Sequence, residues 1–366
     1  MTKLHEATEL GQSIWLDYIR RSFIESGELQ RLIDEGLRGI TSNPSIFEEA
    51  IGNSSDYDDA MRHLTAEGKT VGELYDALVI KDIQAAADLL RPVYDQSDGI
   101  DGYVSLEANP NLAYDVEGTI EEVHHLHAQV DRPNVMFKIP ATTAGIPAIA
   151  TLISEGIPIN VTLIFSLKHY EAVADAYIRG IERRALAGDD ISKVASVASF
   201  FISRVDTVVD KKLQAVGKHD LTGKIGVANA KLAYARYLSI FSSERWQQLE
   251  AKGAQAQRIL FGSTSVKNPD YPDTFYVDNL MGANTVNTLP RVALDALRDH
   301  GVIASGLTNN LEQARQLLNQ LAALGIDLDA ITQALQDKGV QQFATSFSKV
   351  SEAIAEKAQQ FRRQTV

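Results

Sequence analysis

The sequence contains no cysteine. This absence excludes disulfide bonds, thiolate catalysis and cysteine-ligated metal sites, and it is compatible with a reducing cytoplasm. Basic residues are in the minority, since 35 Lys and Arg face 48 Asp and Glu and the formal net charge is −13. Such an acidic chain argues against a role in binding nucleic acid.

Long apolar runs are also missing. No stretch approaches the roughly 20 apolar residues that a membrane-spanning helix needs, and residues 1–21 lack the apolar core of a secretory signal. We therefore expect a soluble, cytoplasmic protein without a membrane partner. The chain has 366 residues, 45% of them hydrophobic, which is enough for one large α/β domain or two smaller ones.

Eight short apolar runs alternate with longer amphipathic segments. This order is typical of parallel strands joined by helices, and eight such units fit a closed (β/α)8 TIM barrel of about 250 residues or more. An open, doubly wound α/β sheet is the alternative, because eight parallel strands do not by themselves prove closure. The runs are residues 13–17, 37–43, 102–107, 134–139, 158–165, 193–203, 258–265 and 284–289.

The segments between the runs are predicted to be helices, and two regions exceed the minimal barrel. Examples of the predicted helices are residues 19–36, 119–130 and 166–188. Ser166 is placed to cap the last of these. Residues 44–98 hold more than one helix after the second strand, and residues 306–366 add helices after the eighth. Because no linker or repeat divides the chain, we predict one barrel domain over residues 1–366 with these two helical additions.

Alternation along the strands gives each one a wholly apolar face, suited to covering helices. In residues 159–164, for example, Ile159, Val161 and Leu163 are expected on the apolar face and Ile164 on the opposite one. The opposite faces are mixed and become polar toward the carboxyl ends of the strands, as the lumen of a functional barrel does. The polar set is Asp17, Asn43, Glu107, Lys138, Asn160, Thr162 and Ser199.

Lys138 stands inside the apolar run NVMFKI, residues 134–139. A lysine is rarely buried without a partner. It is either a snorkelling or salt-bridged side chain, or an amine kept partly uncharged so that it can attack a carbonyl. A purely structural barrel has no reason to bury two carboxylates, a lysine, hydroxyls and amides together. The polar set therefore favours a functional Lys138.

These residue types suit the cleavage of a β-hydroxy ketone. A desolvated Lys138 can form an imine with the ketone, and the iminium withdraws electrons so that the Cα–Cβ bond breaks. Asp17 is a candidate to take the proton from the substrate hydroxyl. Glu107, helped by Thr162, is suited to holding the water that shuttles protons during imine formation.

Further polar residues suit a phosphorylated sugar. Asn43 and Asn160 can form hydrogen bonds with sugar hydroxyls. Arg204 follows the sixth run directly, where barrel loops often hold a phosphate, and Lys267, after the seventh run, can add a second cation. The sequence thus predicts a phosphosugar site at the barrel mouth.

Plainer alternatives remain open at this point. Asp17 can be a helix cap or an ion-pair partner. Arg204 can pair with Asp206 or Asp210 on a helix surface, and Lys267 can be a solvated surface lysine.

The histidines and glycines point to no other chemistry. His124, His125 and His127 resemble a metal cluster only superficially, because they lie on an exposed-looking helix without matching ligands downstream. No P-loop and no GxGxxG segment follows a strand, so nucleotide binding has no support.

The chain resembles the transaldolase family, in its longer bacterial subfamily. GITSNPSIF, residues 39–47, is similar to the family's first signature, and NVMFKIPATTAGIPAI, residues 134–149, to the segment around its Schiff-base lysine. The resemblance covers at least residues 11–290. Further segments in family order are VSLEANP (104–110), INVTLIFS (159–166) and SFFISRVD (199–206).

The resemblance implies a (β/α)8 barrel with the lysine on strand four, where Lys138 falls. It implies transfer of a dihydroxyacetone unit from a ketose phosphate, such as sedoheptulose 7-phosphate, to glyceraldehyde 3-phosphate in the pentose phosphate pathway, giving erythrose 4-phosphate and fructose 6-phosphate. No metal and no organic cofactor are implied. The implied roles are the imine for Lys138, proton acceptance for Asp17, the catalytic water for Glu107 and Thr162, substrate hydroxyls for Asn43, Asn160 and Ser199, and phosphate for Arg204.

Some questions stay open at the level of sequence. The seventh-strand region departs from the shorter bacterial enzymes, which have an arginine near Lys267. Phe201 shares the parity of Ser199, so we expect its ring in the lumen, either as core filling or to keep the imine dry. The rival functions are a Schiff-base fructose-6-phosphate aldolase and a non-catalytic phosphosugar-binding barrel, and the chain is expected to be a monomer or a homodimer.

Overall fold

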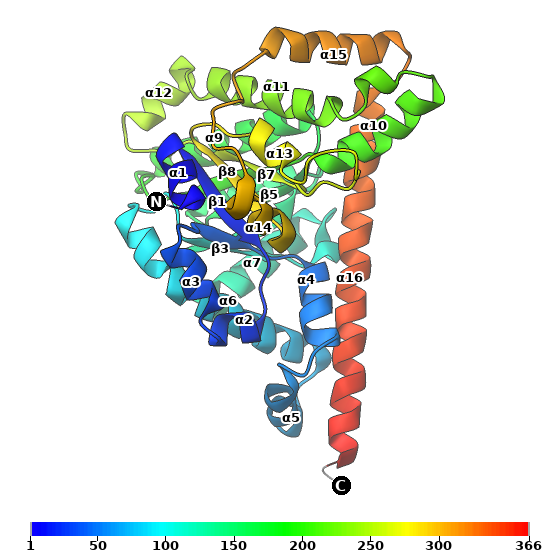
Figure 1. The fold of residues 1–366 in the computed structure, drawn as a ribbon. Coiled ribbons are helices and arrows are strands. Elements are labelled where there is room, and N and C mark those ends of the chain that lie inside the picture. Colours follow the sequence, from blue (N-terminus) through cyan, green and yellow to red (C-terminus); the bar gives the residue numbers. More distant parts are fainter. Residues whose placement is uncertain (1, 365–366) are drawn as a thin grey trace.

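The computed structural model describes residues 2–364. Its eight parallel strands pair in chain order, and the eighth pairs back onto the first, so the sheet closes (Figure 1). The predicted (β/α)8 barrel is confirmed and the open sheet is excluded. The strands are β1 (Gln12–Asp17), β2 (Gly39–Thr41), β3 (Tyr103–Glu107), β4 (Val135–Pro140), β5 (Ile159–Ile164), β6 (Ser196–Phe201), β7 (Arg258–Gly262) and β8 (Thr285–Leu289).

Helices surround this barrel. In the first half of the chain they are α1 (Lys3–Leu10), α2 (Arg21–Glu25), α3 (Glu28–Asp34), α4 (Pro44–Phe47), the π-turn η1 (Glu48–Gly52), α5 (Asp58–Ala66), α6 (Val71–Gln96), the 3-10 turn η2 (Pro110–Leu112), α7 (Val116–Val130) and α8 (Gly145–Glu155). In the second half they are α9 (Leu167–Ala187), α10 (Ser203–Ala215), the 3-10 turn η3 (His219–Leu221), α11 (Ile225–Ile240), α12 (Glu244–Glu250), α13 (Phe275–Asn279), α14 (Arg291–His300), α15 (Leu311–Ala323) and α16 (Leu328–Gln364).

The helices predicted for residues 119–130 and 166–188 are present as α7 and α9. Ser166 caps α9, since its Oγ accepts a hydrogen bond from the backbone N–H of His169 at 3.1 Å. Residues 19–36, in contrast, form two helices instead of one. Gly27 adopts a left-handed φ of 80°, a conformation that ends α2 and lets the chain turn into α3.

The two predicted helical additions are also present. After β2 the chain forms α4, η1, α5 and α6, and Thr70 starts α6 through a capping box with Glu73. After β8 it forms α14, α15 and α16. Helix α16 runs the length of the molecule, from α10 past α4 to α5 (Figure 1). Its middle therefore lies near the carboxyl ends of the strands.

The amino-terminal half of the lumen is closed by apolar and aromatic side chains. Trp15, Tyr103, Met136 and Leu260 pack together there, on the strand faces that alternation predicts for the lumen. Gly39 makes room for them, because a Cβ at this position would lie 2.6 Å from the indole ring of Trp15. This half is a packed plug, which leaves the opposite half for chemistry.

Strand β5 departs from simple alternation near its end. Leu163 has a positive φ of 59°, and the register between β5 and β6 shifts between Val161 and Ile164. The prediction that Leu163 faces the covering helices and Ile164 the lumen is therefore wrong. Ile164 packs in the main core, whereas Leu163 packs at the barrel mouth beside Phe165 and Phe201. The irregular backbone at Leu163 therefore places the side chains of residues 163 and 164 on the opposite faces from those that alternation predicts.

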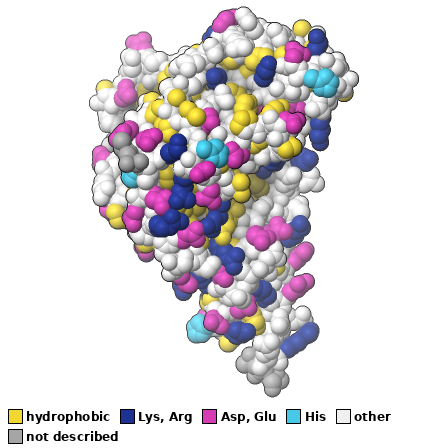
Figure 2. Space-filling view, in the orientation of Figure 1, with side chains coloured by type: hydrophobic (Ala, Val, Ile, Leu, Met, Phe, Trp, Pro, Cys, Tyr) yellow, Lys and Arg dark blue, Asp and Glu magenta, His cyan; other side chains and the backbone are white. Residues whose placement is uncertain are grey.

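The surface view shows how charge is distributed. On the face in Figure 2, Lys and Arg side chains are interspersed with Asp and Glu, so the excess of acidic residues forms no separate patch there. Within residues 2–364, none of the helices is both long enough and apolar enough to cross a membrane.

Candidate active site

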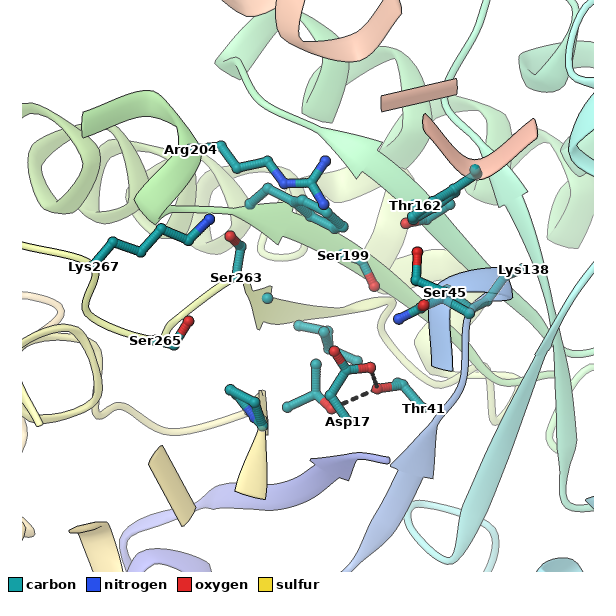
Figure 3. A pocket seen from close by; sticks show the side chains of 17 residues that line it. Asp17, Thr41, Ser45, Lys138, Thr162, Ser199, Arg204, Ser263, Ser265 and Lys267 are labelled. Atoms are coloured by element: carbon teal, nitrogen blue, oxygen red, sulfur yellow. Dashed lines mark hydrogen bonds between the residues drawn. The ribbon is translucent and has the colours of Figure 1, made fainter. Parts of the chain in front are cut away.

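A cavity of about 240 Å³ opens at the carboxyl ends of the strands (Figure 3). Eight of the ten residues selected from the sequence line it: Asp17, Asn43, Lys138, Thr162, Ser199, Phe201, Arg204 and Lys267. The other two stand directly behind the lining, since Glu107 contacts Lys138 and Asn160 contacts Ser199. Residues far apart in the sequence thus meet at one site.

Lys138 lies deep in this site and is buried. Its Nζ is 2.7 Å from Oε2 of Glu107 and donates a hydrogen bond to the carbonyl oxygen of Ser42 at 2.9 Å. The pairing of β3 with β4 places Glu107 opposite Lys138, which explains the contact. The salt bridge considered from the sequence exists, and its partner is itself a residue suited to proton transfer.

The Glu107 carboxyl is buried, and burial raises its pKa, while the nearby Lys138 acts in the opposite direction. Its Oε1 has no hydrogen-bond partner among the described residues, and the same holds for Oγ1 of Thr162. Buried polar atoms are seldom left unpaired. These two atoms are therefore free to hold a water molecule or a substrate oxygen beside Lys138.

Asp17 lies across the cavity from these groups. Its Oδ1 accepts a hydrogen bond from Thr41 Oγ1 at 2.8 Å, and Thr41 Oγ1 is also 2.7 Å from Thr288 Oγ1. Burial raises the pKa of Asp17, while Lys138 and the Thr41 hydrogen bond lower it. Asp17 forms no ion pair and caps no helix among the described residues. A carboxyl held in this way, facing a cavity, is suited to exchanging a proton.

Three predicted polar side chains are held by the fold itself. Asn43 caps α4 by accepting a hydrogen bond from the N–H of Ile46 at 3.1 Å, and it lies beside Asp17, whose pKa it helps to lower. Asn160 accepts a hydrogen bond from Ser199 Oγ at 2.6 Å and donates one to Ser105 Oγ at 3.0 Å. These bonds fix the amides and the hydroxyl in position, which pre-organises them for a ligand.

Two cations gather at the other end of the cavity, where Figure 3 shows Arg204 and Lys267 close together. Arg204 donates to Gln342 Oε1 at 3.3 Å and lies 5.1 Å from the centre of the Phe201 ring. Burial lowers the pKa of Arg204, and burial and the Arg204 charge both lower the pKa of Lys267. Neither side chain forms a salt bridge within residues 2–364.

The alternative partners of Arg204 are bound elsewhere. Asp206 accepts hydrogen bonds from the N–H of Gly226 and from Tyr276, and Asp210 from the N–H of Gly223 and from Tyr271. The surface ion pair considered for Arg204 is therefore absent. Two unneutralised cations side by side are suited to an anion such as a phosphate.

Sequence reasoning missed several residues that line the cavity. The hydroxyls of Thr41, Ser45, Ser263, Ser265 and Thr288 carried no signal beyond their place near strand ends. Phe343 of α16 lines it as well, and only the docking of that helix brings it there.

The histidine cluster does not contribute to the site. His124 pairs with Glu155 and His125 with Asp76, both on the surface. In the part of the chain that the structure describes, no group of histidine and acidic residues is arranged to hold a metal ion.

Comparison with known proteins places this site in a family. A model of the transaldolase/fructose-6-phosphate aldolase family matches residues 14–354. The chain belongs to this family. It is 47% identical to a transaldolase from Acidothermus cellulolyticus over 365 residues, which cover 99% of this chain and 98% of that protein. It is also 47% identical to a transaldolase from Thiobacillus denitrificans over 346 residues, 93% of this chain and 96% of that protein.

A third relative, a transaldolase from Mycobacterium bovis, is 46% identical, with 93% of each chain covered. Such likeness over nearly the whole length identifies the chain as an enzyme of the transaldolase type. It is a transferase of carbohydrate metabolism and acts in the pentose phosphate pathway.

Proposed function

We propose that the chain transfers a dihydroxyacetone unit from sedoheptulose 7-phosphate to glyceraldehyde 3-phosphate through an imine on Lys138. The observation that carries this proposal is the buried Lys138–Glu107 pair at 2.7 Å, set beside the unpaired atoms of Glu107 and Thr162. Imine formation requires a nucleophile and a base in contact, and polar atoms beside them that can hold a water.

The first stage is imine formation. Attack on the substrate carbonyl needs the free amine, and Glu107 is placed to take a proton from Lys138 because burial raises the pKa of its carboxyl. The amine then adds to the carbonyl carbon. The resulting hydroxyl leaves as water after it is protonated. A water held by Glu107 Oε1 and Thr162 Oγ1 provides the path for these protons.

The second stage is cleavage of the carbon–carbon bond. Asp17 takes the proton of the substrate hydroxyl as the bond breaks, the electrons move into the iminium, and an enamine stays on Lys138. The first aldehyde leaves and the acceptor aldehyde enters. The enamine carbon attacks the new carbonyl, and Asp17 returns its proton to the oxygen. Asn43, Asn160 and Ser199 hold the sugar hydroxyls during both steps.

The third part of the proposal is the position of the substrate phosphate. Arg204 and Lys267 lie together, without carboxylate partners, at one end of the cavity, and Lys138 lies deeper in it (Figure 3). We assign the phosphate to the two cations and the reacting carbonyl to Lys138. A bound phosphate would also offset the repulsion between the cations.

The remaining parts of the proposal follow from this chemistry. Its partners are phosphorylated sugars. The chain's own amine, carboxyls and hydroxyls suffice for each step, so the mechanism calls on no cofactor. We place the enzyme in the cytoplasm, as a monomer or a homodimer, without nucleic-acid or membrane partners.

Trapping with borohydride tests the proposal. The enzyme is incubated with fructose 6-phosphate and borohydride, digested, and mapped by peptide mass. We expect a reduced three-carbon adduct on Lys138 in the wild type and in Lys231→Met, and none in Lys138→Met. Lys231 is a partly buried lysine outside the barrel lumen, which makes it a matched control. An adduct on any other lysine, or none at all, contradicts the proposal.

The rival activity is separated by the products. A fructose-6-phosphate aldolase releases free dihydroxyacetone, whereas a transaldolase needs an acceptor aldehyde. We expect turnover of fructose 6-phosphate in the presence of erythrose 4-phosphate to exceed by far the release of dihydroxyacetone in its absence. Equal rates would favour the aldolase.

A further inference from the structure

Helix α16 crosses the barrel mouth and brings Phe343 to the catalytic lysine. The Phe343 ring lies with its centre 5.7 Å from Lys138 Nζ and lines the same cavity as Lys138 and Thr162. It is only 5% exposed. An aromatic side chain close to the reacting nitrogen therefore comes from the far end of the chain and from outside the barrel.

Helix α16 is anchored to the barrel by Gln336, which precedes Phe343 by about two helical turns. Gln336 is buried, and its Nε2 donates to the carbonyl oxygens of Ala141 at 2.9 Å and Leu163 at 3.1 Å. These carbonyls lie at the carboxyl ends of the catalytic strands β4 and β5. Gly339 lets the helix come close, since a Cβ there would lie 2.7 Å from the Leu163 side chain. Leu163, whose φ is positive, thus contacts α16 through both its carbonyl oxygen and its side chain.

On its carboxyl-terminal side, α16 is held by the insertion after β2. Ser346 Oγ lies 2.9 Å from Ser45 Oγ, and the Phe347 ring packs edge-on against Tyr75 with 5.1 Å between ring centres. Phe343 thus stands between two anchors, one on the strands and one on the insertion. The segment of α16 that carries Phe343 is therefore fixed against both the strands and the insertion.

We propose that Phe343 is a positioning residue that shields the Lys138 adduct from bulk water and so decides between transfer and hydrolysis. This inference rests on the proposed imine mechanism. After cleavage the enamine on Lys138 must wait for an acceptor. If its carbon takes a proton first, the iminium of dihydroxyacetone forms. Water then adds to the iminium carbon, the proton is released, and the carbon–nitrogen bond breaks. Free dihydroxyacetone and the Lys138 amine result, with one water consumed.

The shield acts on this side reaction because an apolar ring offers neither a proton nor a hydrogen bond to a water. The polar atoms in contact with Lys138 Nζ belong to Glu107 and Ser42, at the ends of β3 and β2. Phe343 covers the side toward α16, where solvent would otherwise enter. The inserted helices and α16, which had no predicted role, hold this cover in place.

The test compares two activities in Phe343→Ala: release of free dihydroxyacetone from fructose 6-phosphate without acceptor, and transfer to glyceraldehyde 3-phosphate. We expect the ratio of release to transfer to rise about tenfold, which corresponds to one unit of log rate. Phe343→Leu keeps the site filled with an apolar side chain and is expected to stay within about threefold of the wild type. The melting temperature of each variant is measured alongside.

Phe361→Ala is the matched control, about five helical turns further along α16, where the ring lies under Arg62 and away from the cavity. It removes the same side chain from the same helix, so its ratio is expected to equal that of the wild type. A rise as large as in Phe343→Ala would mean that loosening the helix is the cause, and it would overturn the inference. An unchanged ratio in Phe343→Ala would overturn it too.

Borohydride trapping distinguishes a failure of the Phe343 inference from a failure of the proposed imine mechanism. If borohydride fixes the adduct on Lys138 in Phe343→Ala while the ratio stays at the wild-type value, the mechanism stands and the shield is wrong. If wild-type Lys138 is never trapped, the mechanism itself is wrong. Should Phe343→Ala fail to fold, Phe343→Gln preserves the length of the side chain but introduces a group that binds water, and it must raise the ratio for the inference to hold.

Discussion

The two ends of the barrel lumen are built from similar residue types and differ in whether charge is neutralised. At the amino-terminal end, Arg258 lies 3.0 Å from Asp101, and Asp101 also accepts hydrogen bonds from Ser13 and Trp15. At the carboxyl-terminal end, Arg204 lacks a carboxylate partner among the described residues, and Glu107 retains one oxygen without a hydrogen bond.

The difference shows which end is built for stability and which for chemistry. A buried ion pair whose members also find hydrogen-bond donors can be tolerated in a fold at little net cost. Two neighbouring cations without carboxylate partners and a buried carboxyl with an unpaired oxygen cost folding energy, and a bound ligand can offset this cost. The same strands supply both ends, a few residues apart. Substitutions at matched positions should therefore separate stability from activity.

The largest effect is expected from Glu107→Gln at the reactive end. The amide keeps the shape of the side chain but removes the base, and loss of a general base costs about 10²–10⁴ in rate. We expect the turnover number to fall by this amount while the Michaelis constant changes little, as measured in steady-state transfer assays. A turnover number within a few-fold of the wild type, with only the Michaelis constant raised, would contradict the assigned role.

The sequence could predict those features of the site that depend on neighbouring residues, and not those that depend on contacts between distant segments of the chain. Strand faces follow from alternation, which is local, so the sequence alone suffices to place Asp17, Lys138 and Ser199 in the lumen. The contact between Glu107 and Lys138 then follows from neighbouring strands with matching registers. These features required only the order of the strands.

Other features depend on contacts across the whole chain, and local patterns do not contain them. Leu163 reads as an ordinary strand residue, and its positive φ arises where α16 docks onto β5. Phe343 reads as one apolar position of an amphipathic helix, with nothing to tell a core contact from a cavity wall. The partners of Arg204 could not be chosen either, since Asp206 and Asp210 both lie within two helical turns of it.

The second prediction concerns Arg258 at the amino-terminal end of the lumen, where a substitution should affect stability and not activity. Arg258→Ala leaves Asp101 buried without its cation, and breaking a buried pair from one side costs about 3 kcal/mol of unfolding free energy. We expect a lower midpoint of urea unfolding and a turnover number per folded molecule close to that of the wild type. A large loss of turnover in the folded variant would show that the two ends are coupled.

The third prediction uses Arg204→Ala, the counterpart at the mouth. A hydrogen bond to a charged group is worth about 1.5–3 kcal/mol, or roughly ten- to a hundredfold in binding. We expect the Michaelis constant for ketose phosphates to rise by this factor, and the constant for free dihydroxyacetone as donor to change far less. Stability should be retained, because no carboxylate loses its partner. Equal losses for both donors would point to a structural role instead.

The smallest effect is expected at Phe201, whose ring lies between Phe165 and the Arg204 guanidinium at the mouth. Phe201→Tyr adds one hydroxyl to this apolar wall, able to donate a proton or anchor a water near the waiting enamine. We expect free dihydroxyacetone release from fructose 6-phosphate to rise and transfer to glyceraldehyde 3-phosphate to fall, each by about a few-fold. The effect should be smaller than that of Phe343→Ala, because a hydroxyl narrows the cavity whereas the loss of a ring opens it to solvent. If the ratio of the two activities stays at the wild-type value, Phe201 fills the core, and the dry side of the imine is maintained from α16 alone.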